Sequence, residues 1–196
     1  SSLTIETIST NNGGGGNSGG NGTIQTIRSK EQIMSCLDEQ GRLRVTPGVH
    51  SMTNAVYEAH KYGITDIFLL NGRHDEEGQV VTIDNSVSVV GESREHCIVM
   101  GGLMMDGKKE YDVNVSNLTL RESKGVGVFG RNGASFHLDN VSVENSGECG
   151  VVVSSTKRST MKNCNVSHSK QSGLFVEWGG LMTIDGNGTT IHHNCT

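Results

Sequence analysis

The sequence predicts an all-β fold, a right-handed parallel β-helix that runs from about residue 64 to the C-terminus. Three observations support this prediction. The chain contains 27 glycines, and aromatic side chains make up only 4% of it. Short runs of alternating apolar residues follow residue 64, and they recur at intervals of 23 to 25 residues. A thin solenoid with a narrow column of small aliphatic side chains has this composition and this period.

Residues 1–28 form the first predicted region, a flexible segment rich in Gly, Asn and Ser. It contains the runs Gly-Gly-Gly-Gly at 13–16 and Gly-Gly-Asn-Gly at 19–22. A segment of this composition cannot bury enough apolar surface to offset the entropy lost on ordering.

Residues 29–63 are predicted to form a helical cap region. Ser29 and Gln32 have the spacing of a capping box, and a short helix follows that ends before Gly41. After a brief strand at 43–45 and a Pro47-Gly48 turn, apolar residues at helical spacing predict a second helix that ends at Gly63. These apolar residues are Met52, Ala55, Val56, Ala59 and Tyr62. The second helix is expected to cap the solenoid, because an open end would present unpaired strand edges.

Residues 64–196 are predicted to form the β-helix itself, with three strands in each coil of about 23 residues. Strands are expected at 67–70, 80–83, 87–90 and 98–100, and four repeat units then begin at Gly102, Gly125, Gly150 and Gly173. Counted from each glycine, positions 1, 3, 11, 16 and 18 are almost always apolar, so they are predicted to line the core. Position 18 places His168 in the core as a neutral histidine.

Position 15 of the repeat predicts an asparagine ladder. Asn117, Asn140 and Asn165 occupy this position, and each begins an Asn-Xaa-Ser/Thr sequence. Glycosylation is one interpretation. A structural role is favoured, because Asn tolerates bent backbone at turns and stacked amides bond to one another.

These Gly-x-x-V and N-V-S units resemble the parallel β-helix repeats of the pectate-lyase-like superfamily, over about residues 64–196. The resemblance implies the fold. It does not imply one activity, because the superfamily includes polysaccharide lyases, uronan epimerases and glycoside hydrolases. It also includes non-catalytic repeat domains, such as those of some F-box substrate receptors and of viral spikes.

Paired carboxylates for glycoside hydrolysis are not evident, so the catalytic residues are unknown at this stage. Asp106 and Glu177 share an outward position, but three coils separate them, which is roughly 14 Å at the spacing of adjacent strands. Asp139 and Asp185 are two coils apart. Arg131, Lys157 and Arg158 are expected to aid solubility from turns, and the acidic run at 75–77 is expected to be solvated.

An outward apolar stripe is the most informative feature for function. Position 2 of the repeat should face solvent, yet it holds Met104, Gly127, Val152 and Phe175, with two aromatic residues nearby. Such a stripe is expected either to bind a ligand or partner or to be covered by an N-terminal segment of the chain. The predicted binding residues are Met104, Phe129, Val152, Phe175 and Trp178.

Composition also limits the partners and cofactors. A net charge of −5 without a dense Lys/Arg cluster argues against nucleic acid. The sequence has no apolar run long enough for a membrane span and no signal-peptide pattern at its start. Five cysteines without a Cys-x-x-Cys motif predict buried free thiols, which favour an intracellular site. No cofactor is predicted, and no metal site, because His192 and His193 should point to opposite faces of a strand.

The resulting hypothesis is a non-catalytic β-helix module that binds a glycan or a protein partner on an outer sheet face. One alternative is a polysaccharide-active enzyme of the lyase or epimerase type, with catalytic residues in loops or absent coils. Another is a structural protein of spike type. The sequence stops where a further coil would begin, which predicts a truncated solenoid or self-association through its open last coil.

Overall fold

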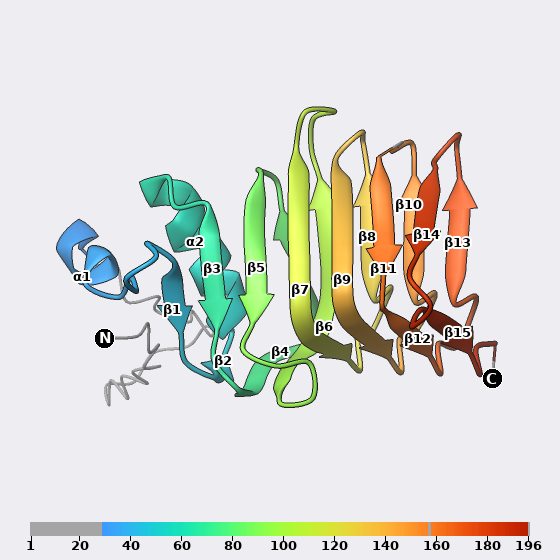
Figure 1. Cartoon of the computed structure of the whole chain (residues 1–196), viewed down its shortest axis with the longest axis horizontal. Helices are drawn as coiled ribbons and strands as arrows, with labels where there is room; N and C mark the ends of the chain where they lie inside the picture. Colours follow the sequence, from blue (N-terminus) through green and yellow to red (C-terminus); the bar gives the residue numbers. More distant parts are fainter. Residues whose placement is uncertain (1–28, 157, 196) are drawn as a thin grey trace, which may run out of the picture.

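The computed structural model describes residues 29–156 and 158–195, and within them it confirms the predicted parallel β-helix. The segment predicted to be flexible, residues 1–28, and Lys157 lie outside the described residues. Successive coils follow one another along the long axis of the molecule in the order of the sequence (Figure 1). The elements are α1 (Lys30–Met34), β1 (Leu43–Val45), β2 (Gly48–Val49), α2 (Ser51–Tyr62), β3 (Asp66–Leu69), β4 (Gly72–Ile83), β5 (Val87–Gly91), β6 (Cys97–Asp106), β7 (Asp112–Arg121), β8 (Val128–Arg131), β9 (Ser135–Glu144), β10 (Val151–Ser154), β11 (Ser159–Lys162), β12 (Asn165–Ser167), β13 (Leu174–Glu177), β14 (Met182–Asp185) and β15 (Thr190–His192).

The strands of successive coils form three parallel sheets, which we call faces A, B and C. Face A contains 80–83 of β4, 102–106 of β6, β8, β10 and β13. Face B contains β1, β3, β5, the first half of β7, the first half of β9, β11 and β14. Face C contains β2, the first part of β4, the first part of β6, the second halves of β7 and β9, β12 and β15. β1 pairs with β3 and β2 pairs with β4, so the parallel strand ladder begins at Leu43, within the region predicted to be the helical cap. The division of the chain into regions at residues 28 and 63 stays a prediction.

The core is a stack of inward side chains, and two alternate positions of each face contribute to it. One column contains Leu103, Val128, Val151 and Leu174 on face A; Val115, Leu138, Met161 and Ile184 on face B; and Leu120, Val143, Val166 and Ile191 on face C. The second column of each face includes Met105, Phe136 and Leu118 respectively. Most of these side chains are fully buried, and their contacts from coil to coil supply the apolar burial that stabilises a thin solenoid. The aliphatic composition is sufficient because each column is only one side chain wide.

The register of the second repeat unit differs from the sequence prediction by two residues. Val128, rather than Val126, lies opposite both Leu103 and Val151, so the unit begins at Gly127 and not at Gly125. The glycine is required there, because a Cβ on residue 127 would collide with the core methyl group Val143 Cγ1. A slip of two residues keeps every side chain on its own face, so an apolar pattern of period two could not reveal it.

The corners between faces carry residues with left-handed backbone. Asn117, Asn140 and Asn163 have φ values of 56°, 56° and 51°, and Asn140 Nδ2 donates to Asn117 Oδ1 at 2.9 Å. The predicted asparagine ladder is therefore present between Asn117 and Asn140. Asn163 occupies the third corner position, but its Nδ2 donates to Asp139 Oδ1 at 3.5 Å. Asn165, the residue predicted for this position, lies instead on β12. The reason is the same two-residue slip between repeat units.

His168 was predicted to face the core, and this prediction is wrong. Val166 occupies the core column, opposite Val143 and Ile191. His168 lies at the next corner with a φ of 57°, and its side chain is exposed. Its ring stacks on that of His193, with 5.4 Å between centroids and planes 4° apart. The imidazole thus continues a corner column instead of filling the core.

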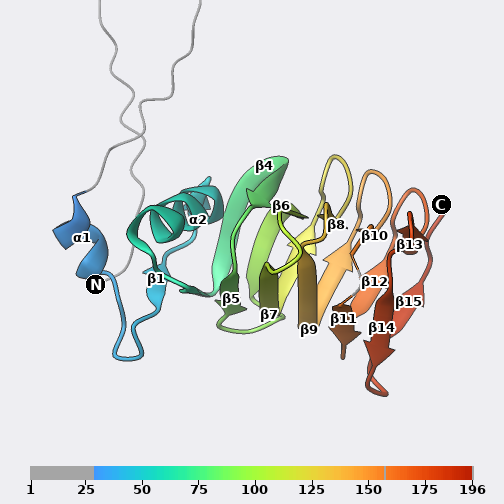
Figure 2. The ribbon, with the colours of Figure 1, turned by 90° about the horizontal axis from the view of Figure 1, so that it is seen from above.

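The helices close the N-terminal end as predicted. The capping box at Ser29 and Gln32 starts α1, and Gly63 ends α2 in the left-handed conformation. In the first coil α2 follows the face C strand β2 and precedes the face B strand β3, so it takes the place of a face A strand. Figure 2 shows α2 beside β4 at this end of the solenoid.

The acidic run at 75–77 was expected to be solvated, and for Glu76 this expectation is wrong. Its side chain is 1% exposed. Glu76 Oε1 accepts from the backbone N–H of Met52, and Oε2 accepts from Thr53 Oγ1. The carboxylate therefore satisfies donors in the first turn of α2, where a negative charge also complements the helix dipole.

Candidate functional site

Face A brings four of the five predicted binding residues into one outward row. The register places Met104 opposite Phe129, Phe129 opposite Val152, and Val152 opposite Phe175. Phe129 holds the place that the sequence analysis gave to Gly127, so the row contains two phenyl rings where one was expected. We call these four residues the apolar row. Because adjacent coils are about 4.8 Å apart, its side chains form a continuous strip along the solenoid.

The members of the apolar row differ in exposure. Val152 is 6% exposed between the two phenyl rings, whereas Phe175 is 45% exposed. Trp178, the fifth predicted residue, is 79% exposed and lies at the corner after β13 with a φ of 50°. Ser155 Oγ of the preceding coil donates to its carbonyl oxygen at 3.5 Å. Trp178 therefore stands beyond the edge of face A, beside the row and not within it.

A second outward row on face A is polar. Asp106 lies opposite Arg131, and Ser154 lies opposite Glu177. Arg131 Nη2 donates to Asp106 Oδ2 at 2.5 Å, and Asn132 Nδ2 donates to the other carboxylate oxygen at 2.7 Å. These two hydrogen bonds hold the pKa of the Asp106 carboxyl below its ordinary value. We call Asp106, Arg131, Ser154 and Glu177 the polar row.

The two rows are in contact through Arg131. Its guanidinium carbon lies 5.8 Å from the centroid of the Phe129 ring, within the range of a cation–π interaction. Face A consequently offers apolar rings on one side and carboxylate, guanidinium and hydroxyl groups on the other. A ligand with both an apolar surface and hydroxyl groups matches such a strip.

The carboxylates at face A come from different coils. Asp106 and Glu177 lie three coils apart, as predicted. Asp84, which no sequence pattern singled out, directly follows Ile83, the last residue of β4, and Ile83 lies opposite Met105. Asp84 and Asp106 are thus neighbours at the ends of adjacent strands. Asp84 Oδ1 is 3.3 Å from His60 Nδ1 of α2, a contact that no sequence spacing indicated.

Face B carries a second polar constellation that the sequence analysis did not find. His137 Nδ1 lies 2.9 Å from Thr160 Oγ1, and its Nε2 lies 3.5 Å from Asp112 Oδ1. Arg158 Nη1 donates to the other oxygen of Asp112 at 3.0 Å. Arg131 and Arg158, both expected to serve solubility, therefore hold carboxylates of other coils: Arg131 that of Asp106 one coil away, and Arg158 that of Asp112 two coils away. The residues come from three coils, so their proximity depends on the register and leaves no local sequence signal.

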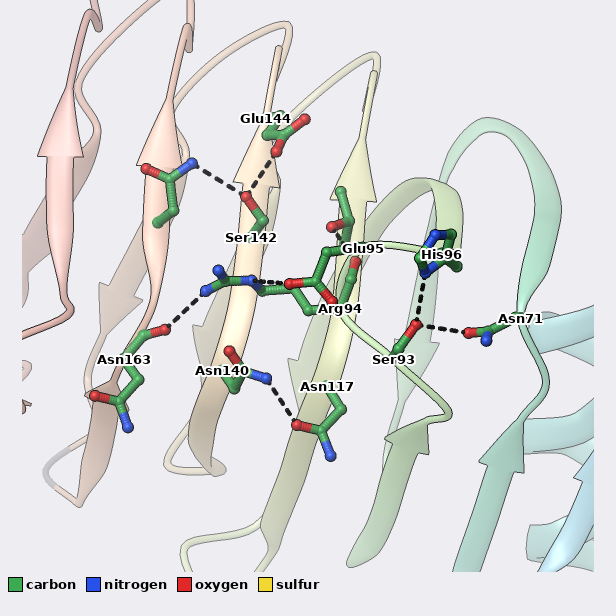
Figure 3. Close-up of polar contacts among 12 residues, drawn as sticks. Asn71, Ser93, Arg94, Glu95, His96, Asn117, Asn140, Ser142, Glu144 and Asn163 are labelled. Carbon is green, nitrogen blue, oxygen red and sulfur yellow. Dashed lines mark hydrogen bonds and ion pairs between the residues drawn. The ribbon is translucent and has the colours of Figure 1, made fainter.

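A loop at 92–96 crosses the asparagine corner between faces B and C (Figure 3). Val90 lies opposite Ser116 and Ile98 lies opposite Thr119, so this loop has no counterpart in the next coil. Ser93 Oγ donates to Asn71 Oδ1 in the preceding coil at 3.0 Å. Arg94 Nη1 reaches forward to the carbonyl oxygen of Asn163 at 3.3 Å. The loop therefore ties several coils together along their corner.

Face C outside this loop is a network of polar side chains that bond to one another. Asn165 Nδ2 donates to Ser142 Oγ at 3.1 Å, and Ser142 Oγ donates to Glu144 Oε1 at 2.7 Å. Arg121 pairs with Glu144 at 2.8 Å. Figure 3 shows Ser142 and Glu144 beside the asparagine corner. Since these groups already satisfy one another, face C offers a ligand fewer unpaired groups than face A does.

The histidines at 192 and 193 do not point to opposite faces, so the reason given for excluding a shared ion was wrong. His193 is left-handed, with a φ of 51°, which interrupts the alternation of the strand. The two ring centroids are 4.8 Å apart. Within residues 29–156 and 158–195, no group of three or more His, Cys, Asp or Glu side chains is arranged to hold a metal ion.

The five cysteines are free, as predicted, and four of them are buried. Burial raises the pKa of the Cys97 thiol to about 12, so this sulfur is not a nucleophile at neutral pH. Cys195 is exposed. Neither described helix has the length and apolar character needed to cross a membrane.

Comparison with known proteins agrees with this architecture. A family profile described as the right-handed β-helix region matches residues 101–196. The search of curated proteins and the search of solved structures each found no match. The matched segment contains the whole apolar row.

Proposed function

Because residues 101–196 belong to the right-handed β-helix family, we propose that the chain is a non-catalytic module that binds a carbohydrate chain along face A. The apolar row beside the polar row is the observation that carries this proposal. Phe129 and Phe175 present rings two coils apart, roughly 10 Å along the axis. An extended ligand can therefore contact both rings at once.

A carbohydrate chain has the chemistry that face A complements. Each sugar ring has a face of C–H groups that packs on an aromatic ring, and a rim of hydroxyl groups that donate and accept hydrogen bonds. Asp106 and Glu177 supply acceptors, while Arg131 supplies donors. Trp178, exposed at the corner, adds a third aromatic surface at the C-terminal end of the strip.

A binding role is favoured over hydrolysis by the state of Asp106. A general acid must hold its proton near neutral pH, whereas the hydrogen bonds from Arg131 and Asn132 keep this carboxyl ionised. Glycoside hydrolysis also requires two carboxyl groups about 5 to 9.5 Å apart. Asp106 and Glu177, three coils apart, exceed this separation.

The experiment is a glycan array that compares the full chain with a Phe129→Ala, Phe175→Ala double variant of matched circular dichroism. Wild type should retain a set of glycans that the double variant loses. A Thr160→Ala variant is the control, because Thr160 lies on face B, and it should retain the same set. Equal retention by all three proteins, or no retention by any, would exclude face A as a glycan site. Loss of a protein partner in a matched pull-down would indicate that face A binds protein instead.

A polysaccharide-active enzyme is the second candidate, and the adjacency of Asp84 and Asp106 favours it. Uronate polymers incubated with wild type would then yield unsaturated or shortened products, and an Asp84→Asn variant would not produce them. The absence of products across a panel of polymers would leave the binding module as the better proposal.

A further inference from the structure

The strand segment 80–83 of β4 is the N-terminal edge of face A. It pairs with β6 on one side. On the other side the first coil has α2 in place of a strand, and in the described part of the chain no strand pairs with this edge. Every second N–H and C=O group of the segment therefore faces away from β6 and toward the helix. Unpaired main-chain groups of this kind are a template for an added strand.

A groove of about 540 Å³ lies between this edge and α2. One stripe of the helix forms its first wall, and the edge strand with the residue after it forms the second. The lining residues are Thr53, Val56, Tyr57, His60 and Lys61 from α2, and Val80, Val81, Thr82 and Asp84 from β4. This volume is in the range of sites that hold ligands the size of a short peptide.

The lining of the groove combines apolar and charged side chains. It includes the aliphatic side chains of Val56 and Val80, and Tyr57 is 56% exposed on the helix wall. His60 and Asp84 are paired at 3.3 Å, while Lys61 Nζ, in the last turn of α2, lies 3.7 Å from Glu58 Oε2 and 4.7 Å from the Tyr62 ring centroid. The Lys61 side chain is 35% exposed, so a peptide carboxylate beside it would be a second anionic partner for its ammonium.

We propose that this groove binds an extended segment of a partner protein, which adds as a strand to the 80–83 edge. The segment carries an apolar side chain that packs against Val56 and Val80, and an acidic side chain that pairs with Lys61. Main-chain hydrogen bonds to the edge supply affinity, and the two side-chain contacts supply selectivity. The proposal is independent of carbohydrate binding on face A, because the groove lies at the N-terminal edge of that sheet.

The first test uses a fluorescein-labelled heptapeptide of alternating Val and Thr with one Glu, titrated with the full chain and followed by fluorescence anisotropy. Two further peptides carry N-methyl groups on the odd or on the even amides. Since only alternate amides of an added strand face the edge, one methylated peptide should lose about tenfold in affinity and the other should bind like the parent. Equal binding of all three, or no binding at about 1 mM protein, would overturn the proposal.

The second test places the peptide in the groove. A Lys61→Glu variant should lose affinity for the Glu peptide and gain affinity for the same peptide with Lys in place of Glu. The Phe175→Ala variant is the matched control and should bind the peptide like wild type. If Phe175→Ala abolishes binding while Lys61→Glu does not, the peptide binds at the apolar row and the groove proposal fails.

Discussion

At the scale of single residues, one glycine in each coil decides where the repeat unit begins. A Cβ on Gly127 would meet Val143 Cγ1 and the carbonyl oxygen of Gly150, whereas a Cβ on Gly125 would meet no atom within 4 Å. The two glycines are separated by a single residue in the sequence and both precede an apolar residue. Close approach of the backbone to the core distinguishes them, and this is a property of the register.

We therefore expect the same substitution to have different effects on stability at the two glycines. Gly127→Ala should lower the free energy of unfolding by about 1 to 3 kcal/mol, because the added methyl group overpacks the corner. Gly125→Ala should change it by less than about 0.5 kcal/mol. Urea unfolding followed by circular dichroism measures both. A larger loss for Gly125→Ala would mean that the second unit starts where the sequence analysis placed it.

The corner asparagines make a second prediction at this scale. Asn140 is left-handed, so Asn140→Ala should cost about 1 to 2 kcal/mol of backbone strain in addition to the lost amide bond to Asn117. Asn140→Gly removes the same bond without the strain and should be less destabilising. Asn114→Ala, on an exposed strand position of face B, is the control. Equal unfolding free energies for the Ala and Gly variants would show that backbone strain is absent.

At the scale of elements, α2 is fastened to the second coil by a buried histidine of β4. His74 is 0% exposed; its Nδ1 lies 2.8 Å from Ser51 Oγ and its Nε2 lies 2.9 Å from the carbonyl oxygen of Leu70. Burial lowers the pKa of His74 below 6.5. The neutral ring can satisfy both contacts, by donating to Leu70 and accepting from Ser51.

This lowered pKa gives stability a pH dependence with a definite sign. The unfolded chain takes up the His74 proton more readily than the folded chain does. The contribution is therefore fully present above about pH 6.5 and declines as the pH falls toward the lower pKa of the folded state. A His74→Gln variant keeps one donor and one acceptor but does not titrate. Between about pH 7.5 and pH 5.5, wild type should lose more unfolding free energy than this variant, and equal losses would contradict the assignment.

The elements also show why part of the site was predictable. Alternation of period two placed Met104, Val152 and Phe175 on one outward face, and pairing in the structure keeps them there. The same period could not detect a slip of two residues, so Phe129 was predicted beside the row and not in it. The His60–Asp84 contact joins a helix to a strand, and such a pair has no spacing signal at all.

At the scale of the whole molecule, composition and repeat length were enough to predict the solenoid. A chain with few aromatic residues and a 23-residue period has few other ways to bury its aliphatic side chains. The replacement of one face A strand by α2 was not predictable from the sequence. It depends on which face the chain reaches when the helix begins, and this in turn depends on the pairing of β1 and β2.

The three faces of the solenoid consequently have different chemistry. Face A joins an apolar row to a polar row, face B carries the pair His137 and Thr160, and face C is a self-bonded polar network. A single long ligand that lies along the axis would contact one face alone. The account therefore predicts that binding protects residues of face A and leaves the other two faces unchanged.

Hydroxyl-radical footprinting of the full chain, with and without a saturating glycan identified on the array, tests this central claim most directly. Oxidation of Phe129, Phe175 and Trp178 should fall when the glycan is bound, while oxidation of His137 on face B and His192 on face C should stay the same. Protection of His137 or His192 with unchanged oxidation of the three aromatic residues would contradict the account and would move the binding site to another face.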